Sequence, residues 1–344
     1  MKEWKRKIKK RMNITMCTVL AIGILLGNCS IKVLAEEGDK VIPCGMPIGI
    51  YMQTDGIMVI GTSAVMGLDG LEKEPAKDIV KAGDYILGYN GVAIREKEEL
   101  LQMVGKSGGE DAVLTIRRDQ ETLDVRMQPV TTSLGEYKLG IWVRDDTQGI
   151  GTMTYIDENG NFGALGHGIS DMDTGELVAI SNGQLYQTQI RSIIKGESGN
   201  PGSLAGVICY GKDSQCGDIF SNTQCGIFGT VSDAFLADVN QEWVEVAEKD
   251  EVHTGEAVIR TTLDGQRNDY TISILEVNAS REGDKKELVL QVTDPRLLDK
   301  TGGIVQGMSG SPIIQDGKLI GAVTHVLVQD STKGYGIFIE DMMR

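Results

Sequence analysis

A serine between glycines near the C-terminus has the surroundings that a catalytic nucleophile needs. Ser309 stands in the stretch GIVQGMSGSPIIQDGKLIGAVTH, with Gly307 two residues before it and Gly310 directly after it. Glycine accepts backbone angles closed to other residues, so a turn here can point the N–H groups of Gly307 and Ser309 at one spot. Two such donors make an oxyanion hole. The stretch therefore predicts either a serine hydrolase or a glycine-rich turn without chemistry.

A serine hydroxyl becomes a nucleophile only when a nearby base takes its proton, and this chain has three histidines. His167 stands in GALGHGISD, where flanking glycines let the backbone turn and leave the ring accessible. His253 lies in a polar stretch and is expected at the surface. His325 lies on an expected strand after Ser309, where a histidine satisfied within a sheet is the simplest interpretation.

The composition indicates a turn-rich β protein with more than one domain. The chain has 344 residues, whereas single domains usually have about 100 to 200. Its 44 glycines and many β-branched residues favour hairpins over helices. A net charge of −15 without a basic stripe makes nucleic-acid binding improbable. No zinc-type spacing or phosphate loop occurs, so we expect no metal and no cofactor.

The first 35 residues have the layout of an export signal. Basic residues precede an apolar run, and Val33, Leu34 and Ala35 precede two glutamates, which predicts cleavage after Ala35. The run is short for a membrane span, although residues 12–28 could serve as an uncleaved anchor. Beyond this segment, Cys44, Cys209, Cys216 and Cys225 form either a disulfide after export or small buried hydrophobic contacts.

Residues 36–130 resemble a PDZ domain of the bacterial export type. The resemblance is carried by Pro75-Ala76, by the turn Lys81–Asp84 and by Asn90-Gly91, within a pattern of short strands and one amphipathic helix at about residues 95–109. It implies that a peptide adds as a strand beside a glycine-containing loop. A domain that binds no free peptide remains the alternative. The matching peptide-binding residues would be Ile48, Gly49 and Ile50.

After a linker at residues 131–138, residues 139–344 read as strand after strand with turn signals, which predicts a barrel or a sandwich. The strings FGALGHGISDMDTG, GESGNPG, GDIFSNTQCGIFG, VTDP and GGIVQGMSGSPIIQDGKLIGAVTHVLV resemble the stage IV sporulation protein B peptidases of endospore formers. That resemblance implies a mainly β chain, with the PDZ domain followed by a chymotrypsin-like double β-barrel serine peptidase.

The resemblance also implies roles for individual residues. Ser309 would be the nucleophile, His167 the general base and Asp294, in QVTDPRL, the acid that orients the histidine. Asp294 precedes Ser309 by few residues, and an aspartate before proline is also an ordinary turn residue. Three other acids therefore compete for its role: Asp171, Asp173 and Asp218. Ser311 is a weaker candidate nucleophile, because it lacks the preceding glycine turn.

Glutamate-specific relatives in the chymotrypsin-like clan place a histidine, on the strand after the nucleophile, in the pocket for the residue before the cut. By this resemblance, His325 is a candidate specificity residue that favours a polar or acidic side chain.

The resemblance further implies export into the space between forespore and mother cell. Expected substrates are the chain itself and a membrane-associated regulator of a membrane-embedded protease complex, whose cleavage activates late mother-cell transcription. The alternatives are a peptide-binding protein with an inactive peptidase domain and a non-proteolytic esterase. No lipid-binding stripe supports the esterase.

Overall fold

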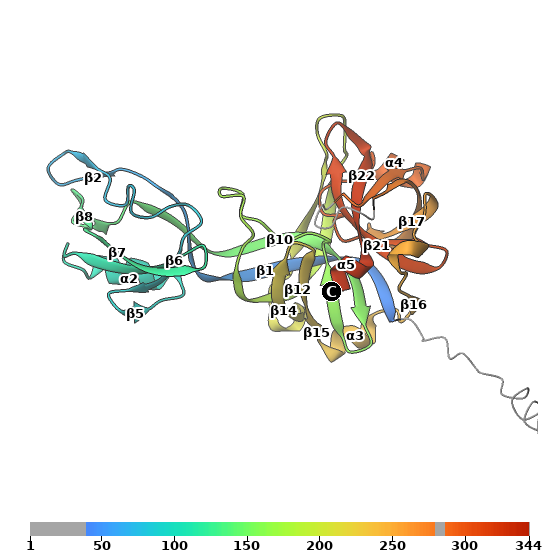
Figure 1. Ribbon diagram of the computed structural model, residues 1–344, viewed down its shortest axis with the longest axis horizontal. Coiled ribbons are helices and arrows are strands. Elements are labelled where there is room, and N and C mark those ends of the chain that lie inside the picture. The colour runs from blue at the N-terminus through green and yellow to red at the C-terminus, as the bar shows by residue number, and fades with distance from the viewer. Residues whose placement is uncertain (1–38, 279–285, 344) are drawn as a thin grey trace, which may run out of the picture. The chain divides into compact units, whose positions relative to one another are not determined.

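The computed structural model describes residues 39–278 and 286–343. The predicted signal or anchor at residues 1–35 lies outside the described residues. Within the described ranges, no helix combines the length and apolar character that crossing a membrane requires. The chain is mainly β, as predicted, and its strands build two closed barrels and one further small domain (Figure 1).

The first barrel is a closed circuit of six strands. Its apolar interior includes the fully buried side chains of Ile48, Ile50 and Phe162. The short α3 (Asp233–Asp238) and the 3-10 turns η1 (Lys212–Ser214) and η2 (Lys249–Glu251) lie between later strands. In order of pairing, the strands are β1 (Lys40–Thr62), β10 (Ile141–Asp157), β11 (Asn161–Ala164), β15 (Gly226–Val231), β14 (Gln215–Thr223) and β12 (Ile180–Ile194), which pairs back onto β1. Two more strands flank this barrel: β13 (Ser203–Ile208) beside β12 and β16 (Val244–Glu245) beside β1. The same sheet continues from β1 into the PDZ-like domain.

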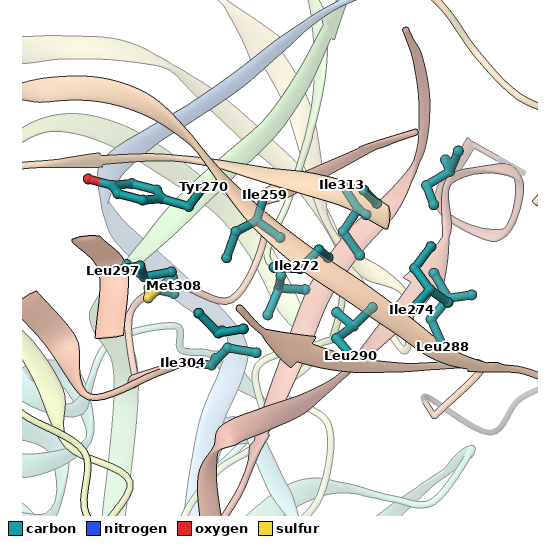
Figure 2. Close-up of a cluster of buried hydrophobic side chains, with 14 of the residues drawn as sticks. Ile259, Tyr270, Ile272, Ile274, Leu288, Leu290, Leu297, Ile304, Met308 and Ile313 are labelled. Carbon is teal, nitrogen blue, oxygen red and sulfur yellow. The ribbon is translucent and has the colours of Figure 1, made fainter. Parts of the chain in front are cut away.

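The second barrel is also closed by six strands, and its core reaches the loop that carries Ser309. Figure 2 shows Ile304 and Met308 from that loop together with barrel residues such as Ile272 and Leu290. Burial of these side chains stabilises the position of the loop. The strands are β17 (Gly255–Leu263), β18 (Gln266–Val277), β19 (Leu288–Val292), β22 (Asp330–Phe338), β21 (Lys318–Leu327) and β20 (Pro312–Gln315), with the helices α4 (Pro295–Thr301) and α5 (Ile339–Met343).

The PDZ-like domain has its own core, in which Ile86, Leu114 and Ile116 are fully buried. The predicted amphipathic helix is present as α2 (Lys97–Gly105), and a capping box between Glu96 and Glu99 begins it. The strands are β2 (Val65–Met66), β3 (Glu72–Lys73), β4 (Tyr85–Tyr89), β5 (Val92–Ala93), β6 (Ala112–Arg118), β7 (Glu121–Met127), β8 (Val130–Thr131) and β9 (Tyr137–Lys138).

Strand β1 belongs to two domains, and this changes the boundaries expected from the sequence. In its first part, residues 48–53 pair with both β10 and β12 inside the first barrel. Its later residues Ile57 and Met58 pair with β4 of the PDZ-like domain. The PDZ-like domain is therefore an insertion in the first barrel, entered along β1 and left along β10. A boundary at residue 36 does not match this pairing, because residues 40–54 belong to the barrel.

Local turn signals in the sequence correspond to turns in the structure. Asp264-Gly265 and Asp316-Gly317 both have positive φ angles at the two turn residues, as type I′ hairpins require. Cys44, Cys209 and Cys216 are free thiols, and Cys44 and Cys216 are buried. Burial raises the pKa of Cys44 to about 12 and that of Cys216 to about 11, so these two thiols act as small apolar side chains.

Candidate active site

The loop that carries Ser309 is anchored by buried side chains on both sides of the turn. Val305 and Met308 are at most 1 % exposed within the core of the second barrel. The Met308 N–H donates to the Val305 carbonyl at 3.1 Å, and the Ser311 N–H donates to the Met308 carbonyl at 2.9 Å. Ser309 itself is half-buried. Its hydroxyl therefore lies near the surface, while the buried neighbouring side chains fix its backbone.

Both glycines that frame Ser309 have backbone angles that favour glycine. Gly307 has φ 98° and Gly310 has φ 94°. A side chain on Gly310 would collide with the carbonyl oxygen of Thr152 and with the backbone of Leu165, since the first barrel packs directly against the loop. The expectation that these glycines build a tight turn is therefore met, and Gly310 is also required for contact between the barrels.

Strand β10 of the first barrel holds the loop with three hydrogen bonds. The Thr152 N–H donates to the Ser309 carbonyl at 3.1 Å, and the Thr152 hydroxyl donates to the Gly307 carbonyl at 2.7 Å. The Thr154 hydroxyl donates to the Gly310 carbonyl at 2.8 Å. These bonds fix the carbonyls on one side of the turn and thereby fix the direction of the N–H groups on the other side.

His167 follows the end of β11 through two residues with left-handed backbone angles. Leu165 has φ 72° and Gly166 has φ 68°. A non-glycine residue at such an angle costs free energy and is most often found at functional sites. The His167 Nδ1 lies 2.9 Å from the Gly168 carbonyl oxygen. Because a carbonyl can only accept, Nδ1 carries the proton in this hydrogen bond and Nε2 is the nitrogen suited to act as a base.

His167 and Ser309 line one pocket at the meeting of the two barrels. The pocket has a volume of about 460 Å³, and its lining includes Gly307, Thr324 and His325. The first barrel contributes His167, and the second barrel contributes the serine, as a chymotrypsin-like arrangement requires. Of the predicted residues, the structure thus brings together the candidate nucleophile, the candidate base and the candidate specificity residue.

The predicted oxyanion donors are directed away from the protein's own acceptors. Among the described residues, neither the Gly307 N–H nor the Ser309 N–H donates to a protein acceptor. The N–H groups of Met308 and Gly310, in contrast, donate to Val305 and Val323. Two donors beside the serine are therefore available to a developing oxyanion.

The Ser309 hydroxyl donates to the Thr324 carbonyl at 2.6 Å. This bond ties the serine to strand β21, directly before His325. Proton transfer to a base requires the hydroxyl to leave this carbonyl first.

Asp294 does not line this pocket, in contrast to the role that the sequence resemblance implies for it. It is the N-cap of α4, where its carboxylate accepts from the Arg296 N–H at 2.8 Å and pairs with the Arg296 guanidinium at 2.6 Å. The side-chain hydrogen bonds from Arg296 lower the pKa of Asp294 to about 2. An aspartate directly before proline at the start of a helix accounts for these contacts without any catalytic role.

The competing acids are also engaged elsewhere. Asp171 and Asp173 both pair with Arg144, and Asp171 accepts from the backbone of its own turn. Asp218 is exposed and accepts from Gln215 at 2.9 Å. Among the described residues, no carboxylate lines the pocket that holds His167 and Ser309.

Two other residues considered from the sequence lie outside the site. Ser311 is fully buried, and its hydroxyl has no hydrogen-bond partner among the described residues, so it is not accessible as a nucleophile. His253 is an exposed residue whose Nε2 lies 2.9 Å from a carboxylate oxygen of Asp316. The surface position expected for His253 is what the structure shows.

The expected peptide-binding residues are buried in the first barrel. Ile48 and Ile50 are each 1 % exposed, and Gly49 faces Ile208 and Thr188 with no room for a side chain. Strand β1 is paired on both sides here, with β10 and with β12, so no free edge remains to accept a peptide strand. The assignment of Ile48, Gly49 and Ile50 to peptide binding is therefore wrong.

An apolar groove lies instead between α2 and the beginning of β10, with a volume of about 580 Å³. From Ile141 to Arg144, β10 pairs with β1 on one edge, and no described strand pairs with its other edge. Gly140, with φ 67°, makes the turn into the strand. The sequence signal was the glycine-containing run KLGI at residues 138–141, which lies across the predicted boundary between the linker and the peptidase domain. Four large side chains at the groove are more than half exposed: Met66, Leu101, Leu134 and Trp142.

Comparison with known proteins gives one family match. The family model described as SpoIVB peptidase S55 matches residues 135–343. No curated protein matches the chain.

Several solved structures are similar at low identity. The PDZ domain of the SdrC-like protein from Listeria monocytogenes is 21% identical, over 26% of this chain and 87% of that chain, with a TM-score of 0.22. The HtrA-type protease AlgW with a decapeptide is 12% identical over 61% of this chain, with a TM-score of 0.34, and this chain spans about half of it, or 52%. The active form of the Rv3671c protease from M. tuberculosis is 13% identical, over 57% of this chain and 72% of that chain, with a TM-score of 0.30.

Proposed function

The chain belongs to the SpoIVB peptidase S55 family and is a serine peptidase, and from this premise we propose that it is an exported, self-cleaving endopeptidase of sporulation signalling. In this proposal Ser309 is the nucleophile and His167 is the general base. The observation that supports these roles is that Ser309 and His167, which come from two different barrels, line one pocket. Beside them, the N–H groups of Gly307 and Ser309 donate to no acceptor among the described residues.

The proposed reaction begins when a substrate carbonyl enters the pocket and the Ser309 hydroxyl leaves the Thr324 carbonyl. The hydroxyl oxygen attacks the carbonyl carbon while its proton moves to His167 Nε2. The electron pair of the carbonyl moves to its oxygen, which the N–H groups of Gly307 and Ser309 stabilise. His167 then gives the proton to the leaving amine, and water releases the acyl group by the same steps.

The proposal assigns the selection of partners to the groove between α2 and β10. A peptide can add as a strand to the open edge of β10, with its apolar side chains against Leu101 and Trp142. The glycine turn at Gly140 precedes this edge, at the position where a PDZ domain holds a terminal carboxylate. Candidate ligands are protein substrates, including segments of this chain.

The place of action in the proposal is the space between forespore and mother cell, reached through the N-terminal export segment. The substrate besides the chain itself is a membrane-associated regulator of a membrane-embedded protease complex, whose cleavage activates late mother-cell transcription. This part of the proposal is supported only by the family to which the chain belongs.

Self-cleavage of purified protein tests the proposal. We expect wild type to produce fragments that mass spectrometry can map, and Ser309→Ala to remain intact under the same conditions. Ser311→Ala is the matched control, because Ser311 is buried outside the pocket and its loss should leave the fragment pattern unchanged. Equal fragmentation of wild type and Ser309→Ala would assign cleavage to a contaminating protease.

A further inference from the structure

The ring of His325 lies beside the ring of His167. The two ring centroids are 4.8 Å apart, and the ring planes are tilted by 32°. His167 belongs to the first barrel and His325 to strand β21 of the second, so this contact joins the two halves of the site. We propose that His325 is a positioning residue, which holds the imidazole of His167 beside Ser309 and stabilises its protonated form. This inference rests on the proposed function.

The need for such a residue follows from the lining of the pocket. The reaction turns His167 into a cation, and in serine peptidases a buried carboxylate usually orients and stabilises that cation. Here the Nδ1 side of His167 faces the Gly168 carbonyl, a neutral acceptor that fixes the tautomer. Among the described residues no carboxylate lines the pocket, and Asp294 is engaged with Arg296. The ring of His325 is a further neighbour of this imidazole that can stabilise its cation.

A neutral imidazole can stabilise an imidazolium that lies beside it. The face of an aromatic ring attracts a cation within about 6 Å of its centroid, and the attraction is stronger where water is partly excluded. The proton that leaves the Ser309 oxygen goes to His167 Nε2, so the positive charge appears in the ring that His325 contacts. The neighbouring ring also limits rotation of the His167 imidazole.

The backbone around His325 is well suited to fix its ring. Thr324, the preceding residue, is fully buried, and its carbonyl accepts the hydroxyl of Ser309 at 2.6 Å. The peptide unit between Thr324 and His325 therefore positions both residues: its carbonyl binds the Ser309 hydroxyl, and its nitrogen belongs to His325. The side chain of His325 can still rotate about Cα–Cβ and Cβ–Cγ, and the contact with His167 restricts both rotations.

Few charged groups surround His167 and His325 in the described residues. The two imidazoles are the titratable side chains that line the pocket among the described residues. On the loop after His167, the carboxylates of Asp171 and Asp173 are paired with Arg144. Protonation of His325 would place a second cation against His167, so the positioning role requires a neutral His325. Activity should therefore depend on both rings at acid pH, as interacting sites do.

The test is the rate at which a small fluorophosphonate labels the full chain, measured from pH 5 to 9. The probe reports activation of the serine and has no amino-acid side chain for a specificity pocket to select. We compare wild type with His325→Ala, His325→Gln and His325→Phe. Because His325 is exposed, loss of the ring should slow labelling about two- to fivefold, the size of a cation–π contact at an exposed site. His325→Phe keeps an aromatic ring and should restore most of the labelling rate. At acid pH, the profile of its labelling rate should show the titration of one group, His167, where wild type shows two interacting histidines.

The labelling rates of the variants show whether His325 positions His167. Slow labelling of the alanine and glutamine variants with recovery by phenylalanine supports the positioning role. A wild-type rate and acid limb in both the alanine and glutamine variants overturn it. If wild type is not labelled while its thermal unfolding is cooperative, the proposed function fails and the inference falls with it.

Discussion

The hydroxyl of Thr152 donates to the carbonyl oxygen of Gly307 at 2.7 Å, across the boundary between the two barrels. Thr152 lies on β10, and the beginning of that same strand forms one side of the apolar groove of the PDZ-like domain. One continuous strand therefore connects the groove to the turn that directs the candidate oxyanion donors. The hydrogen bonds of β10 to this turn have consequences for both rate and stability.

Thr152→Val removes this bond without changing the shape of the side chain. The Gly307 carbonyl loses its partner and the turn can rotate, so peptidase activity should fall about 10- to 100-fold. Thr188→Val on β12 is the matched control, since the Thr188 hydroxyl has no partner among the described residues and its loss should be neutral. Cleavage assays on both variants, with unfolding curves, check this. Equal activity of the two would show that the Thr152 bond does not shape the turn.

Asp294→Ala should lower stability more than catalysis. The N-cap and the ion pair with Arg296 are lost, which costs about 1 to 2 kcal/mol of unfolding free energy at pH 7. Because the pKa of Asp294 is lowered from 3.8 to about 2, its contribution is present above pH 3.8 and is lost as the pH falls to about 2. Unfolding curves from pH 2 to 7 measure the difference. A thousandfold loss of activity in a well-folded variant would restore Asp294 as the orienting acid.

The groove should bind short peptides that end in an apolar residue with a free carboxylate. Leu101→Glu and Trp142→Ala alter side chains that are 66% and 62% exposed, so they should weaken binding about tenfold or more without unfolding the domain. Phe220→Glu changes a residue of β14 that is 64% exposed and lies outside the groove, which makes it the control. Fluorescence anisotropy with labelled hexapeptides ending in Val, Leu or Phe gives the affinities. Peptides that bind all four proteins equally would place the binding site elsewhere.

A buried carboxyl group should make stability depend on pH near neutrality. Burial, followed by a hydrogen bond with Asp341, raises the pKa of Glu287 from 4.5 to about 7. The folded protein then holds a proton that the unfolded chain has lost, so stability falls as the pH rises from 4.5 to about 7. Glu287→Gln should match wild type near pH 4.5 and be more stable at pH 8, because its amide can donate to Asp341 permanently. Melting temperatures that show no gain at pH 8 would contradict this.

The sequence predicted the elements whose signals are local. The amphipathic helix expected at about residues 95–109 is present as α2, and the Asp-Gly pairs at 264–265 and 316–317 form tight turns among the strands of the second barrel, because neighbouring residues alone determine these conformations. The shared pocket of His167 and Ser309 followed from glycine-rich strings and from the family resemblance. Those glycines are required where the two barrels touch, as at Gly310.

Local sequence patterns could not predict the features that depend on segments far apart in the chain. The run around Ile48, Gly49 and Ile50 resembles a peptide-binding edge, but strand β12 covers it from more than a hundred residues away in the chain. Asp294 fits a triad by its order in the chain, yet the neighbouring Arg296 engages its carboxylate. The contact of His325 with His167 is equally non-local, since it exists only once both barrels have formed.

The most direct test of the central claim is to identify the residue that a fluorophosphonate modifies in the intact chain. Wild type should carry one adduct, on the peptide that contains Ser309, and both Ser309→Ala and His167→Ala should remain unmodified although folded. An adduct that persists in Ser309→Ala, or a folded wild type that takes up no label, would contradict the claim that these two residues form the reactive centre.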